Sequence, residues 1–383
     1  MGSDDRMPQV GKSDGAVMTG GALIAWLLAF LVSAGCGGGS TNTSGGGGGP
    51  SVSATIAVGT GPSAIAVDST TNKIYVTDFG TIPTGIPCSM SGADVEAIDG
   101  ATQAKTSVGF SPLNQVNATH AALNPVSHKL YVQIIAYWNG INGDPCVPFS
   151  PGMEEFDTTS LQPPNGHIFV AAEAGIDVNP VTDTIYVTYP GVGSTGAVFV
   201  DSWDPNLQEL ATIPVGSVPI GVAVDATSNK IYVANSGSNN ISVIDGASNS
   251  VVATVTDPNA VSPGAVAVNA TTNTIYVANS QSNNLTVIDG TTNTVTATIP
   301  VGTSPSGVAV DSQTNFIYVA NFGNSQGGNP GNVTVIDGAT NATSTLADPN
   351  AKNPVAVAVN STTNKIYVAN SGSNNVTVID GAQ

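Results

Sequence analysis

Basic residues are scarce in this sequence. It contains 8 Lys and Arg against 26 Asp and Glu, which gives a formal net charge of −18. The single arginine, Arg6, lies in the N-terminal leader. Proteins that bind nucleic acids hold the phosphate backbone with clustered Arg and Lys. We therefore expect no nucleic-acid partner, and the acidity is typical of a soluble surface that resists nonspecific association.

Charged and aromatic residues are also few. Charged residues make up 9% of the chain and aromatic residues 5%, whereas 41% of the residues are hydrophobic. Disordered chains combine low hydrophobicity with high charge, so this composition argues against disorder. The abundance of Gly, Thr, Ser, Asn and Val is typical of β-strands and turns. A chain of 383 residues exceeds one ordinary core, which favours a modular β fold.

The N-terminal apolar run is too short to cross a membrane. It covers residues 22–34, whereas a spanning helix needs about 20 residues. Two basic residues precede it, so residues 1–35 are typical of a signal peptide. The stretch "LVSAGC" resembles the lipobox of bacterial lipoproteins, which implies lipidation of Cys36, although Ser33 replaces the usual Leu. The alternative is a retained anchor helix from about Val17.

A Gly- and Ser-rich segment, residues 36–51, follows the leader. The stretch "GGGSTNTSGGGGGP" offers no side chains that could build a core. We expect a flexible tether that spans ~20 Å on average. The expected protein is exported and anchored to the membrane by its lipid alone, in the periplasm or at the cell surface.

A motif of an aliphatic residue, Tyr and Val recurs seven times. Its tyrosines are separated by 56, 55, 46, 44, 42 and 49 residues. They stand at positions 75, 131, 186, 232, 276, 318 and 367. A period in the forties with β-rich content is typical of propeller blades, each a four-stranded sheet. We therefore predict an all-β fold, a seven-bladed β-propeller over residues 52–383.

One repeat shows the four strands directly. Short runs rich in Val and Ile alternate with turns rich in Asp, Asn, Gly and Ser, which predicts successive antiparallel strands. In blade four these runs are residues 221–225, 230–235, 241–245 and 251–256. Small residues alternate with Val in the first run, as expected where the blades converge on the axis.

The two ends of the repeat region complement each other. The last copy stops after three strands, and residues 52–59, "VSATIAVG", match residues 295–302, "VTATIPVG", a fourth strand. We predict that residues 53–58 pair with residues 375–380 as the outer strand of blade seven. This pairing closes the ring and leaves no blade edge open.

The repeats resemble the YVTN family of β-propellers. The family motif stands as "YVTD" at 75–78, "YVTY" at 186–189 and "YVAN" at 232, 276, 318 and 367, and "VIDGAT" at 335–340 also fits. The resemblance covers about residues 52–383. It implies a propeller of the kind found in bacterial and archaeal cell-surface proteins. The family repeat carries no common catalytic residue, so the resemblance implies no particular activity.

Blades one and two depart from the regular repeat. The loop between second and third strands is "SGSNN" in blade four, but it enlarges to residues 79–92 in blade one and 136–152 in blade two, with a milder version at 322–331. These loops contain four of the few aromatic residues, Phe79, Tyr137, Trp138 and Phe149. We predict a recognition surface here. The alternative is drift in tolerant loops.

The same two loops contain Cys88 and Cys146, the only cysteines besides Cys36. In an oxidising compartment a disulfide between neighbouring loops is the favoured interpretation. A metal site or a reactive thiol pair is the alternative, but neither loop contains a histidine.

His120 and Asp177 interrupt two rows of small residues in the innermost strands of blades two and three. A carboxylate among small buried residues needs a partner. The two could form an ion pair, a metal corner or an acid/base pair, or each could be a satisfied polar contact that lines the channel. Glu173, at the head of the same blade-three strand, could join any of these.

We predict a non-catalytic binding module whose partner is a protein, a glycan or an envelope component, with no cofactor and no metal ion. The first alternative is an enzyme similar to propeller lactonases, lyases or dehydrogenases, with its site at the channel mouth. Such sites gather several His, Asp, Glu or Arg residues, and the predicted propeller contains no Arg. The second alternative is a purely structural repeat protein of the envelope.

Overall fold

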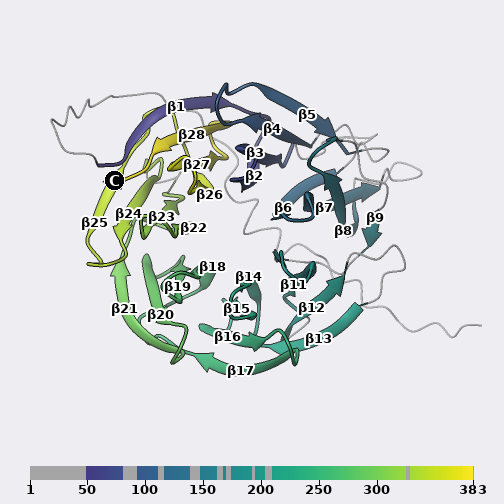
Figure 1. The fold of residues 1–383 in the computed structure, drawn as a ribbon, viewed down its shortest axis with the longest axis vertical. Helices are drawn as coiled ribbons and strands as arrows, with labels where there is room; N and C mark the ends of the chain where they lie inside the picture. Colours follow the sequence, from purple (N-terminus) through teal and green to yellow (C-terminus); the bar gives the residue numbers. More distant parts are fainter. Residues whose placement is uncertain are drawn as a thin grey trace, which may run out of the picture. The chain divides into compact units, whose positions relative to one another are not determined.

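The chain folds as a seven-bladed β-propeller, which confirms the predicted fold class. The computed structural model describes residues 49–80, 93–110, 116–138, 147–161, 167–169, 174–191, 195–202, 209–324 and 328–382. These residues form 28 strands in seven four-stranded antiparallel sheets, arranged around a ring (Figure 1). They belong to the second of two units, residues 1–43 and 44–383. No helix among them is long and apolar enough to cross a membrane.

The strands of each blade follow in order from the centre of the ring outward (Figure 1). Blade one consists of β2 (Pro62–Asp68), β3 (Lys73–Asp78), β4 (Asp94–Asp99) and β5 (Lys105–Gly109). Blade two consists of β6 (Val116–Asn124), β7 (Lys129–Trp138), β8 (Val147–Asp157) and β9 (His167–Phe169). Blade three consists of β10 (Gly175–Asn179), β11 (Thr184–Tyr189), β12 (Gly196–Ser202) and β13 (Glu209–Val215).

The remaining blades are more regular. Blade four consists of β14 (Pro219–Asp225), β15 (Lys230–Asn235), β16 (Asn240–Asp245) and β17 (Ser250–Val255). Blade five consists of β18 (Pro263–Asn269), β19 (Thr274–Asn279), β20 (Asn284–Asp289) and β21 (Thr294–Pro300). Blade six consists of β22 (Pro305–Asp311), β23 (Phe316–Asn321), β24 (Asn332–Asp337) and β25 (Thr343–Leu346). Blade seven consists of β26 (Pro354–Asn360), β27 (Lys365–Asn370), β28 (Asn375–Asp380) and β1 (Ser51–Ala57).

Each turn between first and second strands is specified by two polar residues. In blade four Asp225 ends β14, and its Oδ1 accepts the backbone N–H of Thr227 at 2.9 Å. Asn229, which precedes β15, has a φ of 52°. Asp and Asn form such side-chain turns readily, and Asn tolerates the left-handed conformation. Blade one repeats the turn with Asp68 and Asn72, so short polar sequences set where strands end.

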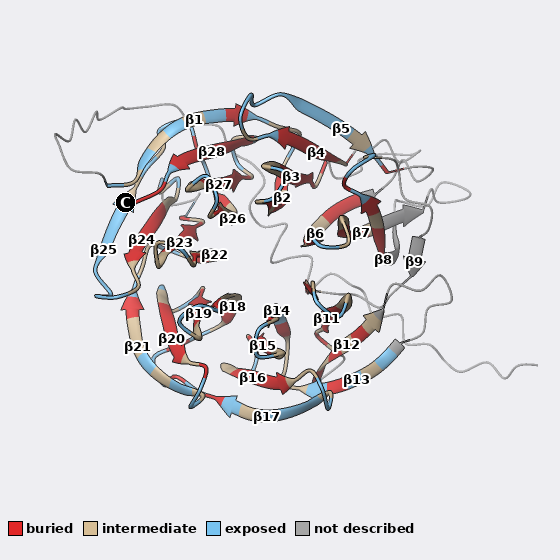
Figure 2. Cartoon of the chain, viewed as in Figure 1, coloured by how far each residue is buried: buried red, intermediate tan, exposed pale blue. Residues whose placement is uncertain are grey.

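The motif tyrosines form the core between blades. Their side chains are at most 2% exposed, and they are Tyr75, Tyr131, Tyr186, Tyr232, Tyr276, Tyr318 and Tyr367. Tyr232 and Val243 of blade four belong to one cluster with Ile275 and Val277 of blade five. Figure 2 shows that buried residues concentrate in the inner strands, whereas outer strands such as β5 and β17 are largely exposed. Each blade therefore covers its apolar face only against a neighbouring blade.

The ring closes as predicted, through pairing of the N-terminal strand with the C-terminal one. β1 pairs antiparallel with β28, from Ser51 opposite Asp380 to Ala57 opposite Asn375. Thr55 Oγ1 also donates a hydrogen bond to Asp348 Oδ2 of blade six at 3.0 Å. The closure therefore joins β1 both to its own blade and to the preceding one.

The long hairpin of blade two differs from the prediction. The sequence predicts a loop over residues 136–152, but β7 continues to Trp138 and β8 begins at Val147, with Trp138 opposite Val147. Aromatic and β-branched residues favour strands, and they extend this hairpin beyond the six-residue second strands of the regular blades. Tyr137 and Phe149 therefore lie on strands, and only residues 139–146 remain between them.

Candidate functional site

Most of the residues predicted to bind a ligand cannot be placed by side chain. The structure describes Tyr137, Trp138 and Phe149 only as backbone positions in β7 and β8. Four other predicted residues, Cys36, Cys88, Cys146 and Glu173, lie outside the described residues. The disulfide, the lipidation and the role of Glu173 therefore stay predictions.

Phe79 is the one predicted aromatic whose surroundings are described. It directly follows β3 and is half-buried. Its backbone N–H donates to the carbonyl oxygen of Gly61 at 2.9 Å, and its own carbonyl accepts a hydrogen bond from Asn117 Nδ2 of blade two. Phe79 thus ties the root of the blade-one loop to its own inner strand and to the next blade.

His120 lies where its row of small residues predicts. It stands opposite Gln133 of β7, a position equivalent to Gly221 opposite Ala234 in blade four. Burial lowers the pKa of His120 to about 4, although a hydrogen bond with Gln133 partly offsets this by raising the pKa. Its Nδ1 has no hydrogen-bond partner among the described residues. At neutral pH the imidazole is therefore uncharged.

Asp177 connects blade three to blade four. Its Oδ2 accepts the backbone N–H of Val224 in β14 at 2.8 Å, and its Oδ1 accepts the N–H of Val178 at 2.9 Å. Burial raises the pKa of Asp177 to about 6, although both hydrogen bonds oppose the shift. No hydrogen bond or ion pair joins this carboxylate to His120, although the structure describes both side chains. Of the interpretations considered, a satisfied polar contact fits Asp177.

The raised pKa of Asp177 predicts a stability that depends on pH. Because the folded-state pKa of about 6 exceeds the usual 3.8, the folded state holds the proton more tightly, and ionisation destabilises it as pH rises through this window. Lowering the pH from 7 to 4 should raise the free energy of unfolding of the wild type by about 2 kcal/mol relative to Asp177→Asn. Urea unfolding across this range measures the difference.

Asp68 provides a control with the opposite sign. Burial opposes the shift, but hydrogen bonds from Thr70 and Thr71 lower the pKa of Asp68. The ionised Asp68 therefore stabilises the folded protein at pH values above its unfolded-state pKa, and this stabilisation is lost as the pH falls towards the folded-state pKa. The wild type should therefore lose stability relative to Asp68→Asn on acidification. Parallel pH profiles for the wild type and Asp177→Asn would contradict the pKa assigned to Asp177.

An acidic cluster in blade one was not predicted. It comprises Asp78 at the end of β3 with Asp94 and Glu96 of β4, and one carboxylate oxygen of each lies within 4.8 Å of the others. Asp78 is 0% exposed and Glu96 5% exposed, whereas Asp94 is half-buried. Lys105 Nζ lies 3.2 Å from Glu96 Oε2. Carboxylate oxygens are ligands for hard cations, so these residues could hold a metal ion.

The electrostatics of the cluster centre on Asp78. Burial, followed by the carboxyls of Asp94 and Glu96, raises the pKa of Asp78 to about 9, while the nearby N–H of Gly59 opposes the shift. Neither carboxylate oxygen of Asp78 has a hydrogen-bond partner of normal geometry among the described residues. A buried polar group normally has a partner, so this carboxylate needs an explanation.

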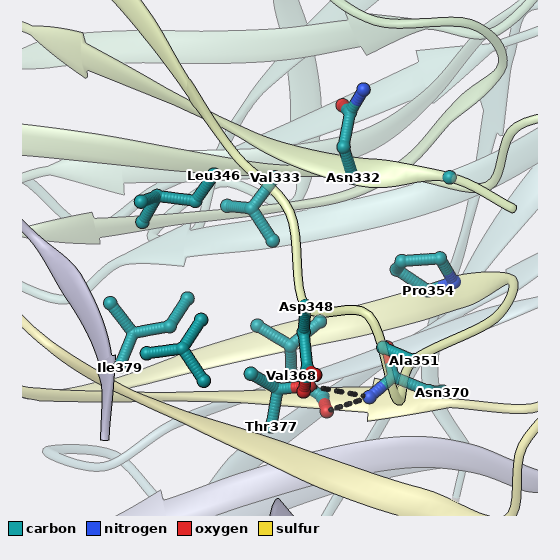
Figure 3. A pocket seen from close by; sticks show the side chains of 12 residues that line it. Asn332, Val333, Leu346, Asp348, Ala351, Pro354, Val368, Asn370, Thr377 and Ile379 are labelled. Carbon is teal, nitrogen blue, oxygen red and sulfur yellow. Dashed lines mark hydrogen bonds between the residues drawn. The ribbon is translucent and has the colours of Figure 1, made fainter. Parts of the chain in front are cut away.

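The equivalent positions in blade seven are neutral, and their side chains form a hydrogen-bond network in which only Asn370 Oδ1 lacks a partner among the described residues. Asn370 Nδ2 donates to Asn375 Oδ1 and to Thr377 Oγ1, both at 2.9 Å. Thr377 Oγ1 in turn donates to Asp348 Oδ2 at 2.7 Å. Figure 3 shows Asp348, Thr377 and Asn370 gathered in this arrangement. Alignment of the third strands, "DVEAID" against "NVTVID", carries the signal that could have revealed the acidic cluster.

The cavity in Figure 3 is too small to be a ligand site. It lies between blades six and seven, lined by Val333 and Leu346 on one side and Val368 and Ile379 on the other. Its volume is about 10 Å³, which leaves room for about one water molecule. A ligand would have to bind elsewhere.

No family model matches this chain, and no curated protein matches it either. The seven internal repeats therefore supply the comparison by which functional and structural residues are distinguished. Among the described strands, the largest departures from the regular repeat lie in blades one and two, with a smaller one between β23 and β24 of blade six, and the acidic cluster lies in blade one.

Proposed function

We propose that the chain is an exported, lipid-anchored propeller that acts as a non-catalytic binding module at the cell envelope. Its ligand would bind over blades one to three, on the side of the long second-to-third-strand connections. The partner class is a protein, a glycan or another envelope component. The leader, the lipobox-like "LVSAGC" and the YVTN-like repeats support the location.

The observation that carries this proposal is the uneven elaboration of the blades. In blades four, five and seven, second and third strands are joined by residues 236–239, 280–283 and 371–374 alone. Blade one places residues 79–93 between β3 and β4, and blade two extends β7 to 10 residues and β8 to 11. Binding residues commonly lie on elaborated loops that a rigid scaffold positions.

Two properties of the inner strands favour binding over catalysis. His120 is neutral at physiological pH, and the carboxylate of Asp177 is engaged by backbone N–H groups of its own and the next blade. An acid/base pair requires groups within hydrogen-bond reach of a shared substrate. A propeller enzyme remains the second candidate, because the predicted pair does lie on adjacent inner strands. A purely structural envelope protein is the third.

Replacement of Trp138 tests the binding surface. Aromatic rings supply large contact areas and stack on sugars or pack on proteins. With purified peptidoglycan and defined oligosaccharides as probes, Trp138→Ala should weaken binding at least tenfold and leave the melting temperature unchanged (a loss of roughly 1.4 kcal/mol). Val252→Ala, which alters a 54% exposed side chain on blade four, is the control and should bind normally.

Other outcomes would redirect the proposal. If a probe binds Trp138→Ala as tightly as it binds the wild type, the binding site does not include Trp138 and lies elsewhere. Turnover of a substrate that disappears in His120→Ala or Asp177→Asn would replace the binding function with an enzymatic one. No affinity for any envelope fraction, together with loss of envelope integrity in cells without the protein, would favour the structural alternative.

A further inference from the structure

We propose that Asp78, Asp94 and Glu96 bind a hard divalent cation, Ca²⁺ in the first instance, inside blade one. The inference does not depend on the proposed binding function, because it concerns carboxylates at the ends of β3 and β4 and none of the aromatic residues of the proposed binding surface. It differs from the expectation drawn from the sequence, which was that the chain holds no metal ion.

The buried carboxylate of Asp78 points to a missing ligand. Its side chain is 0% exposed, and neither of its oxygens has a hydrogen-bond partner of normal geometry among the described residues. It faces the carboxylates of Asp94 and Glu96, which are acceptors when ionised, so an ionised Asp78 finds no donor among them. Unpartnered buried charge is costly, and coordination of a metal is one of the few arrangements that stabilise it.

The scaffold does not require these acids. In blade four the same three positions carry Asn235, Asn240 and Ser242, and Asn235 Nδ2 donates to the other two side chains at 2.9 and 3.0 Å. Blade seven has the corresponding Asn and Thr network. A blade therefore forms with neutral residues here, and the carboxylates of blade one call for an explanation other than folding.

Of the three acids, Glu96 alone forms an ion pair with a described residue. In blade seven Asp348, from the connection that precedes the blade, accepts a hydrogen bond from Thr377, the residue equivalent to Glu96. A Cβ atom on Gly59 would lie 2.3 Å from Asp78 Oδ2, as one on Gly302 would lie 2.6 Å from Asn321 in blade six, so the repeat keeps a glycine beside this position. Lys105 pairs with Glu96 at 3.2 Å. No cation among the described residues pairs with Asp78 or Asp94, and a divalent ion would supply one.

The spacing suits calcium. Ca²⁺ takes six to eight oxygen ligands at about 2.3–2.6 Å, so ligand oxygens on opposite sides of the ion lie roughly 5 Å apart. The three carboxylate oxygens lie within 4.8 Å of one another, a span that one Ca²⁺ can bridge. Mg²⁺ demands near-ideal octahedral geometry at about 2.0–2.1 Å and gives up its water reluctantly, so a site of three carboxylates on two strands favours the more tolerant Ca²⁺. Water would complete the coordination.

The site lies where the ring closes. Lys105 Nζ, which pairs with Glu96, also donates to the carbonyl of Ala57 in β1 at 2.6 Å. Asp78 and Asp94 are the residues at which β3 ends and β4 begins, so the ion would hold together the two ends from which the blade-one connection leaves. Calcium should therefore stabilise both the closure and the base of the enlarged loop.

The test is calcium titration of the metal-free full-length protein. Oxygen sites in extracellular modules bind Ca²⁺ with a dissociation constant of roughly 0.1–1 mM. At 10 mM CaCl₂ the folding equilibrium should shift about 10- to 100-fold, which raises the melting temperature by about 2–5 °C over NaCl of equal ionic strength. Calorimetry should find one site, with weaker binding of Mg²⁺.

The repeat itself supplies the matched variants. Asp78→Asn with Asp94→Asn restores the neutral pair of blade seven, so the protein should fold and lose the calcium response. The control variant, Asp289→Asn with Asp337→Asn, removes the same amount of charge from two turns and should keep the calcium response. Both aspartates accept backbone N–H groups. Asn269 accepts the same kind of hydrogen bond in its own turn, so asparagine should be tolerated there.

A wild type that shows neither binding heat nor thermal shift would overturn the proposal. A response retained by Asp78→Asn with Asp94→Asn would also overturn it, since the ion would then bind elsewhere. Should that variant fail to fold, Glu96→Gln decides by calorimetry, because loss of one of three carboxylates should weaken binding at least tenfold.

Discussion

A chain that lacks β1 is expected to lose on the order of 5 kcal/mol of its free energy of unfolding, a large part of the stability of a typical domain. Deletion of residues 2–58 would remove the pairing of β1 with β28, and it would remove Ile56 from the cluster that it forms with Ile74 and Val378 and expose these two residues. It would also remove the hydrogen bond from Thr55 to Asp348. Both the lost burial and the lost ladder contribute to the effect.

The deletion should also cause self-association. Without β1, β28 becomes an edge strand with unpaired backbone groups, which can pair with another chain. Deletion of residues 2–48 is the matched control, because it removes the leader and most of the tether but retains β1. Guanidinium unfolding followed by circular dichroism, with light scattering for mass, compares the two. Equal midpoints for both deletions would show that closure by β1 contributes little.

The second large effect is expected at a motif tyrosine. Tyr232 is 0% exposed and lies between blades four and five, in contact with the cluster of Ile241, Val255 and Ile288. Tyr232→Ala leaves a ring-sized cavity that the packed blades cannot fill, and such changes cost about 3–5 kcal/mol. The free energy of unfolding from urea titration measures the loss.

Tyr232→Phe distinguishes the contribution of the aromatic ring to stability from that of the hydroxyl, because it removes only the hydroxyl. The hydroxyl of Tyr232 has no hydrogen-bond partner among the described residues, and burial raises its pKa to about 12. Removal of an unpaired buried hydroxyl should change stability by less than about 1 kcal/mol, or increase it. Tyr318→Phe is a useful contrast, since the Tyr318 hydroxyl accepts the N–H of Ala382 at 3.2 Å. A large loss in Tyr232→Phe would indicate an unrecognised partner for the hydroxyl.

Several features were predictable because they depend on local sequence. The spacing of the Tyr motifs predicted seven blades, and the match between residues 52–59 and 295–302 predicted the closure of the ring. Aligning inner strands on the motif also placed His120 and Asp177 at the correct register, opposite Gln133 and Tyr186. In each case the determinant is a short run of apolar residues and its turn, which lies within one repeat.

The predicted loop of blade two was wrong in extent because strand length depends on pairing. Tyr137 and Trp138 follow a long run of mostly apolar residues in β7, and the sequence alone is compatible with either a loop or a continued strand at these two positions. Pairing with Val147 and Pro148 of β8 decided for the strand. Such pairing is not local, and strand propensity varies with the neighbours that a residue meets.

The sequence alone thus determined the repeat, the number of blades and the closing strand, because apolar period and turn chemistry are local properties. Only the tertiary structure decided what the charged groups do. Asp177 is engaged by Val224 of the next blade, and the three acids of blade one, Asp78, Asp94 and Glu96, converge with one of them unpartnered. The burial and the partners of a carboxylate depend on which strands adjoin it in space, and those contacts set both its pKa and its capacity to bind a cation.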